Sequence, residues 1–175
     1  MKIFLIGYMA SGKTTIGKRL SKMMELDFID LDQLIESREK TTINEIFESG
    51  GEALFRGLEM KYLKEVISIT ENAIISTGGG TPCFYSNMEL MNASGLTVFL
   101  EMDAKSITYR LMNAKSTRPI ISKIGEEELL EFVEQQMEER RFFYNEASIT
   151  FNTLGMNARK LKNLASIIEE SLSTK

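Results

Sequence analysis

A chain of 175 residues is long enough for one well-buried core and short for two, so we expect one domain over 1–175. A net charge of −4 argues against a general nucleic-acid-binding protein, and the absence of histidine excludes His-based catalytic triads and His-ligated metals. The single cysteine, Cys83, cannot form an internal disulfide, no apolar run reaches the length of a membrane span, and no signal-peptide pattern is present. We therefore expect a cytoplasmic, monomeric protein without nucleic-acid or membrane partners.

Short apolar runs alternate with longer helical patterns along the chain. In chain order the patterns predict strand 2–6, helix 13–25, strand 26–30, helices 32–38, 43–49 and 52–69, strand 73–77, helix 86–93, strand 96–101, helices 104–113 and 126–143, strand 147–151 and helix 157–172. Capping boxes are predicted for Thr42 with Glu45 and for Ser86 with Glu89. This alternation predicts an α/β fold with a mainly parallel sheet, whose ligands bind beyond the carboxyl ends of the strands.

A phosphate-binding motif follows the first predicted strand. Residues 7–14, GYMASGKT, match G-x-x-x-x-G-K-[ST] in full. Glycine lets the backbone curl so that successive N–H groups face one anion at a helix N-terminus, Lys13 would reach the β- and γ-phosphates, and the Thr14 hydroxyl would ligate Mg²⁺. We expect Lys13 at a solvent-facing junction of loop and helix. The predicted ATP contacts in this stretch are Gly7, Ala10, Ser11, Gly12, Lys13, Thr14 and Thr15.

The remaining sequence narrows the class of P-loop protein. The stretch NAKS at 113–116 is not the N-K-x-D motif of a GTPase, and motor ATPases are usually larger. Their Walker B strand ends in acidic residues, whereas the predicted strand 73–77 runs into Gly78, Gly79 and Gly80. A small-molecule kinase is the remaining interpretation.

Two carboxylates, Asp30 and Asp32, follow the second predicted strand. At a strand end, residues two apart project to one side, so both would face the phosphate loop. One could hold Mg²⁺ and the other could meet a substrate hydroxyl. Capping of the helix that begins nearby is an alternative role, and the spacing does not decide between them.

Further motifs follow in order: FRGLE at 55–59, STGGG at 76–80, RP at 118–119 and R-x-x-x-Y at 140–144. With them, the chain resembles the shikimate kinase family over residues 1 to about 152. The resemblance implies a P-loop three-layer sandwich with a five-stranded parallel sheet and a mobile lid at approximately 112–125. It also implies Mg²⁺-dependent transfer of the γ-phosphoryl group of ATP to the 3-hydroxyl of shikimate. The products would be shikimate 3-phosphate and ADP, on the route to chorismate and the aromatic amino acids.

The resemblance implies roles for individual residues. Those implied in catalysis are Lys13, Asp32 and Arg118, and those implied in holding Mg²⁺ are Thr14 and Asp30. Shikimate would be bound by Asp32, Arg56, Gly78, Gly79, Gly80 and Arg140, with the two arginines on its carboxylate. The glycines would bring backbone N–H groups close to the substrate. Arg118 would reach the phosphates from the lid, and Arg110 would lie near adenine.

Helix geometry separates two neighbouring arginines. Arg140 lies three residues after Met137 and seven after Val133, on the apolar stripe, whereas Arg141 can form a surface ion pair with Glu138. We therefore expect Arg140 to point inward.

Alternatives remain for two other arginines and for the function. Arg56 could instead form ion pairs with Glu59 and Glu52, which could also orient it for the substrate, and Arg110 could be a solvated helix residue. The rival functions are another small-molecule kinase, such as a gluconate kinase, and a nucleotide-binding regulator without catalysis. Against the regulator stands the joint presence of five residues: Lys13, Thr14, Asp30, Asp32 and Arg118.

Overall fold

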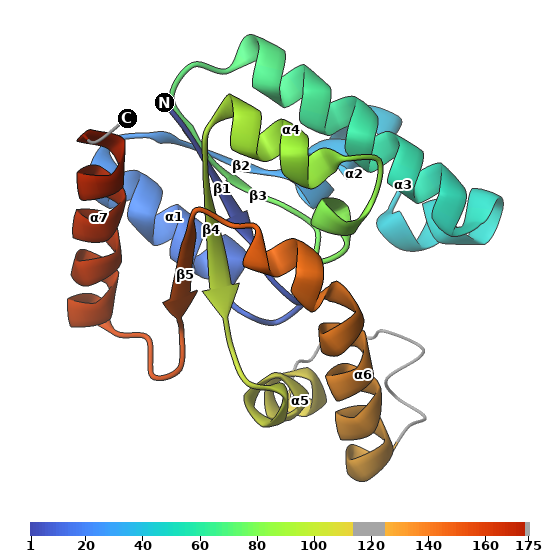
Figure 1. Ribbon diagram of the computed structural model, residues 1–175. Helices are drawn as coiled ribbons and strands as arrows, with labels where there is room; N and C mark the ends of the chain where they lie inside the picture. The colour runs from blue at the N-terminus through green and yellow to red at the C-terminus, as the bar shows by residue number, and fades with distance from the viewer. Residues whose placement is uncertain (114–124, 174–175) are drawn as a thin grey trace.

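The computed structural model describes residues 1–113 and 125–173 (Figure 1). The strands are β1 (Lys2–Ile6), β2 (Asp27–Asp30), β3 (Ala73–Ser76), β4 (Leu96–Glu101) and β5 (Ile149–Asn152). The helices are α1 (Lys13–Met24), α2 (Leu31–Glu39), α3 (Ile43–Ile69), α4 (Asn87–Ser94), α5 (Ala104–Asn113), α6 (Glu126–Asn145) and α7 (Ala158–Ser173), with a short 3₁₀ helix, η1 (Thr81–Cys83). The predicted strands and helices are confirmed with boundaries shifted by at most two residues, and η1 was not predicted.

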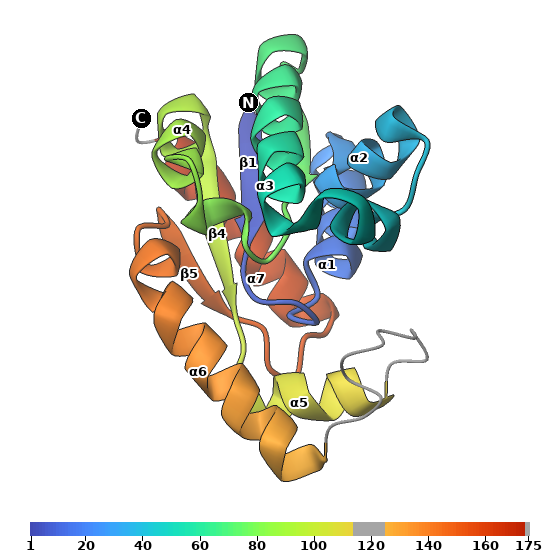
Figure 2. The same cartoon turned by 90° about the vertical axis from the view of Figure 1, so that its right-hand side faces the viewer.

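The strands form one parallel sheet in the order β2-β3-β1-β4-β5. Helices α1 and α7 cover one face, and α3 and α4 cover the other (Figures 1 and 2). The fold class predicted from the sequence is therefore confirmed as a three-layer α/β sandwich with a five-stranded parallel sheet. Because all strands run the same way, the loops that follow them gather at one edge.

Strand β1 lies at the centre of the sheet and is buried on both faces. Ile3 and Leu5 pack in the cluster that contains α1 and α7, whereas Phe4 and Ile6 pack in the cluster that contains α2, α3 and α4. All four side chains are completely buried. A continuous apolar run is typical of a parallel strand covered by helices on both sides, and it fixes the start of the following loop.

Helix α3 contains the two predicted helices, joined at a break. Gly51 has φ 66° and ψ −168°, a backbone conformation that only glycine adopts readily, and the helix axis turns there (Figure 2). The capping box at its start is confirmed: the Glu45 amide donates to Thr42 Oγ1 (3.2 Å), and the Thr42 amide donates to Glu45 Oε2 (2.8 Å). The break places Glu52 in the first turn of the second helical part.

The predicted capping box of α4 is wrong. Ser86 does precede the helix, but its backbone is left-handed (φ 56°, ψ 26°) and its side chain makes no capping hydrogen bond. A side-chain cap needs an extended backbone, which aims the hydroxyl at the amides of the first turn. Tyr85, with φ 53°, is left-handed too, so the turn after η1 sets the backbone at this position.

Two further predictions concern chain segments. In the part of the chain that the structure describes, no helix combines the length and hydrophobicity that crossing a membrane requires. The predicted lid at approximately 112–125 lies outside the described residues except at its ends, and Arg118 lies outside them as well.

Candidate active site

The phosphate-binding motif forms a curled loop between β1 and α1. Left-handed backbone occurs at Gly7 (φ 142°), Ala10 (φ 61°) and Gly12 (φ 99°), the last of which is the N-cap of α1. A Cβ atom on Gly7 would lie 2.8 Å from the carbonyl oxygen of Leu100, so a side chain does not fit there. The loop therefore has the tight turn and the helix N-terminus that binding a phosphate requires.

Lys13 folds back over this loop. Its Nζ donates to the carbonyl oxygens of Gly7 (2.8 Å) and Tyr8 (2.9 Å), and the residue is only 8% exposed. The expectation of a solvent-facing Lys13 was wrong, because the side chain runs along the loop rather than away from it. The neighbouring Thr15 is exposed on α1.

Asp30 ends β2 and has two contacts. Its Oδ1 accepts from the Gln33 amide (3.3 Å), which makes it the N-cap of α2, and its Oδ2 accepts from Thr14 Oγ1 (2.7 Å). Asp30 therefore caps α2 and at the same time lies beside the phosphate loop. Among the described residues no group of three or more acidic, cysteine or histidine side chains could hold a metal. Two adjacent oxygen donors fit Mg²⁺, which usually keeps several waters and binds substrate phosphates.

Asp32 lies in the first turn of α2 and is not the cap. Its Oδ1 is 3.2 Å from the position of a Cβ atom on Gly78, so it faces the glycine loop after β3. The structure thus separates the two carboxylates: Asp30 caps the helix beside Thr14, and Asp32 faces Gly78.

Arg56, on α3, is held by acidic and aromatic neighbours. Its Nη1 donates to Glu59 Oε2 (2.5 Å), and its Nε and Nη2 donate to Glu52 Oε1 (3.1 and 3.0 Å). The guanidinium carbon lies 4.5 Å from the ring centroid of Phe84. Burial by itself lowers the pKa of Arg56, but the two carboxylates outweigh it and raise the pKa. The alternative of ion pairing is therefore observed, and Arg56 stays charged.

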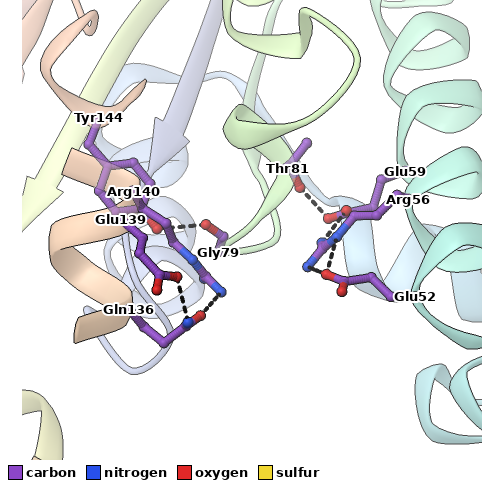
Figure 3. A network of polar contacts seen from close by, with 9 residues as sticks. All are labelled: Glu52, Arg56, Glu59, Gly79, Thr81, Gln136, Glu139, Arg140 and Tyr144. Atoms are coloured by element: carbon purple, nitrogen blue, oxygen red, sulfur yellow. Dashed lines mark hydrogen bonds and ion pairs between the residues drawn. The ribbon is translucent and has the colours of Figure 1, made fainter. Parts of the chain in front are cut away.

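Arg140, on α6, faces the same loop from the other side. Its guanidinium lies over the ring of Tyr8 (5.2 Å), and its Nη2 donates to Gln136 Oε1 (2.8 Å). Figure 3 shows Arg140 and Arg56 pointing toward one another from opposite helices. Arg141 is exposed and pairs with Glu138 (2.7 Å), so the predicted helix register is confirmed.

Tyr144, one turn after Arg140, ties α6 to the glycine loop. Its hydroxyl donates to the carbonyl oxygen of Gly79 (2.6 Å), and its ring stacks on Phe99 (4.9 Å). Burial raises the pKa of Tyr144, which keeps the hydroxyl protonated as a donor.

The glycine loop lies between these groups. A Cβ atom on Gly79 would be 3.5 Å from Arg140 Nη1, and one on Gly80 would be 2.5 Å from Arg56 Nη2. The loop therefore places Asp32, Arg56 and Arg140 around one short backbone segment.

Arg110, on α5, contacts the phosphate loop. Its Nη1 donates to the carbonyl oxygen of Ala10 in the phosphate loop (3.0 Å). It also lines a pocket of about 400 Å³ together with Lys105, Tyr109 and Leu154. A pocket of this volume beside a phosphate loop is large enough for a purine base.

Some residues of the site were not predicted. Thr81 donates through its hydroxyl to Glu59, and Phe84 stacks on Arg56. Leu154 lines the pocket beside Arg110. Only Thr81 had a signal in the sequence, since it follows the three glycines directly.

Known proteins are similar to this chain over most of its length. The family model for shikimate kinase matches residues 9–172. A shikimate kinase of Azobacteroides pseudotrichonymphae is 53% identical over 150 residues, which is 86% of this chain and 88% of that protein. The crystal structure of shikimate kinase from Bacteroides thetaiotaomicron has a TM-score of 0.91 and 43% identity, covering 99% of this chain and 98% of that one. Shikimate kinase from Acinetobacter baumannii in complex with shikimate has a TM-score of 0.80 and 31% identity, covering 99% and 94%. The chain therefore belongs to the shikimate kinase family and is an ATP-dependent phosphotransferase with an alcohol group as acceptor.

Proposed function

We propose that this chain transfers the γ-phosphoryl group of Mg·ATP to the 3-hydroxyl of shikimate at the carboxyl edge of its sheet. The observation that carries the proposal is the pair of arginines, Arg56 on α3 and Arg140 on α6, directed at one another across the glycine loop. Two guanidinium groups on opposite sides suit a carboxylate, which arginine binds bidentately. Gluconate is a carboxylate too, and membership of the shikimate kinase family favours shikimate over it.

The proposed proton acceptor is Asp32. Its carboxylate faces Gly78 at the start of the glycine loop, where a substrate held by Arg56 and Arg140 would present its hydroxyls. As the 3-hydroxyl oxygen forms its bond to the γ-phosphorus, the bond to the β-phosphate oxygen breaks and ADP leaves. Asp32 takes the hydroxyl proton.

The nucleotide side supplies charge neutralisation. Lys13 lies on the phosphate loop, where its ammonium would face the β- and γ-phosphates. Thr14 and Asp30 would hold Mg²⁺, which when bound would neutralise phosphate charge. The pocket at Arg110, Tyr109 and Leu154 would take the adenine. From the sequence alone, we propose Arg118 and a lid at approximately 112–125 as the cover of the phosphates.

The wider setting is proposed on compositional grounds. The chain would form one domain over 1–175 and act as a cytoplasmic monomer. The net charge of −4 agrees with small-molecule substrates rather than nucleic acid, and the single cysteine agrees with the cytoplasm.

ADP release with Mg·ATP in the presence of shikimate, gluconate or no acceptor tests the proposed reaction. We expect ADP release with shikimate, and none with gluconate or without an acceptor. Asp32→Asn removes the charge and the proton acceptor while keeping the shape, and it should lower kcat at least about 100-fold with ATP binding intact. Asp30→Asn should instead raise the Mg²⁺ concentration needed for activity. Near-normal kcat in Asp32→Asn would rule out the proton-acceptor role.

A further inference from the structure

The side chain of Arg56 already binds two carboxylates of its own chain. A guanidinium has five N–H donors, and its Nε and Nη2 groups form one edge that matches a carboxylate. Glu52 Oε1 accepts from both groups on this edge (3.1 and 3.0 Å), and Glu59 accepts from Nη1. Glu52 thus occupies an edge of Arg56 that a substrate carboxylate would also fit.

The two glutamates differ in how firmly they are held. The Glu59 side chain is completely buried and also accepts from the Thr81 hydroxyl, so it is fixed. The Glu52 side chain is 58% exposed, and both hydrogen bonds that the structure gives it go to Arg56 (Figure 3). Glu52 also follows the break at Gly51, in a first helical turn where a carboxylate is favourable without Arg56. It can therefore leave Arg56 at low cost, whereas Glu59 cannot.

The charges around the two arginines are unequal. Arg56 lies between two carboxylates, so this group of three side chains carries a net charge of −1 when all are ionised. Arg140 is held by the neutral amide of Gln136 and keeps its charge uncompensated by that contact. An anionic substrate is attracted on the Arg140 side, while on the Arg56 side it meets an arginine whose positive charge is outweighed by two carboxylates.

We propose that Glu52 sets the affinity for the substrate by competing with its carboxylate for the Nε and Nη2 edge of Arg56. Substrate engages this edge only in the fraction of molecules in which Glu52 has moved away from Arg56. The apparent affinity is therefore the intrinsic affinity multiplied by that fraction. Glu59 is the residue that orients Arg56. This inference rests on the proposed role of Arg56 in binding the shikimate carboxylate.

The test is Glu52→Gln, which keeps the size of the side chain and removes its charge. Because the Glu52 carboxylate is mostly exposed, its pair with the buried Arg56 should shift the equilibrium about as much as a surface ion pair does, by up to about fivefold. The KM for shikimate, and its dissociation constant measured by calorimetry, should therefore fall about two- to fivefold, with kcat nearly unchanged. Glu48→Gln is the matched control, because Glu48 is an exposed carboxylate of the same helix. It should change neither value.

Shikimate methyl ester separates competition from a general charge effect. Because the ester has no carboxylate, its binding should be the same in wild type and Glu52→Gln. A KM for shikimate that rises in Glu52→Gln would mean that Glu52 orients Arg56, and an unchanged KM would mean that it does not compete; either result overturns the proposal. Failure of the proposed function would look different, since wild-type protein would then not phosphorylate shikimate.

Discussion

Replacing Gly80 with alanine tests whether the glycine loop positions Arg56, the arginine that we propose binds the substrate carboxylate. The backbone at Gly80 has φ −94° and ψ −13°, which alanine adopts without strain. The effect of Gly80→Ala must therefore come from the added methyl group. That group would lie 2.5 Å from Nη2 and 2.7 Å from Cζ of Arg56.

The size of the displacement follows from these distances. Ordinary contact begins at 3.4 Å, so the guanidinium must retreat from 2.5 Å by about 0.9 Å. Glu59 is completely buried and Phe84 stacks on the guanidinium, so neither gives way easily. A charge-assisted hydrogen bond contributes about 1.5–3 kcal/mol, and losing one raises a dissociation constant about 10- to 150-fold. We expect the KM for shikimate to rise about 10- to 100-fold.

Steady-state ADP release, measured while shikimate and ATP are varied separately, checks this prediction. The KM for ATP should stay within about twofold, because the phosphate loop follows a different strand. Gly57→Ala is the control: Gly57 is the next residue after Arg56, a Cβ atom there meets nothing within 4 Å, and alanine should stabilise the helix by about 0.5–1 kcal/mol. A normal shikimate KM in Gly80→Ala would refute the argument that this glycine makes room for Arg56.

Lys13, the neighbouring Arg140 and Arg141, and Cys83 each give a further prediction. Lys13→Ala should lower turnover at least about 100-fold. It should also lower the melting temperature slightly, because two loop carbonyls lose their donor. Near-native turnover would contradict the proposed role of the phosphate loop. Arg140→Ala should raise the KM for shikimate strongly and Arg141→Ala hardly at all, since an exposed ion pair contributes about 0–1 kcal/mol; equal effects would contradict the assignment. Burial raises the pKa of Cys83 from 9.0 to about 11, so at pH 8 its thiolate should be about 100-fold scarcer than in an unperturbed thiol. Alkylation by iodoacetamide should be slow at pH 8 and accelerate as the pH rises toward 11, and rapid alkylation at pH 8 would show that the thiol is not buried.

The fold was predictable where a strand is buried on both faces of the sheet, because its sequence is then a continuous run of apolar residues. Strand β1 reads as a continuous apolar run because its alternate residues enter two different cores. The break in α3 was visible because Gly51 is one of two consecutive glycines in a helical pattern. The prediction of a capping box at Ser86 was wrong because the backbone there is set by a turn that the local sequence does not indicate. Tyr85 and Ser86 are both left-handed, although neither residue type prefers that conformation, because the turn that leaves η1 requires it.

The site was predictable where a role depends on spacing in the sequence. Arg140 and Arg141 were separated by helix periodicity, and their surroundings agree with it. The burial of Lys13 was not predictable, because it depends on how the loop curls back beneath the side chain. Phe84 and Leu154 were missed for a similar reason: Phe84 contacts Arg56 and Leu154 lines a pocket with Arg110, and in both cases the residues are distant in the chain.

The three glycines after β3 have a second physical purpose beyond exposing backbone amides. Two of them leave room for side chains of α3: Gly78 for Glu59 and Gly80 for Arg56. A Cβ atom on Gly79 would reach ordinary contact with Arg140 on α6, at 3.5 Å from its Nη1. Gly79 also comes close to the phosphate loop, where its Cβ atom would be 3.2 Å from the Met9 amide nitrogen. A loop without side chains therefore sets the separation between the arginines and the phosphate loop. Since phosphoryl transfer depends on positioning more than on covalent chemistry, a displacement of this loop should lower activity even where every charged residue is retained.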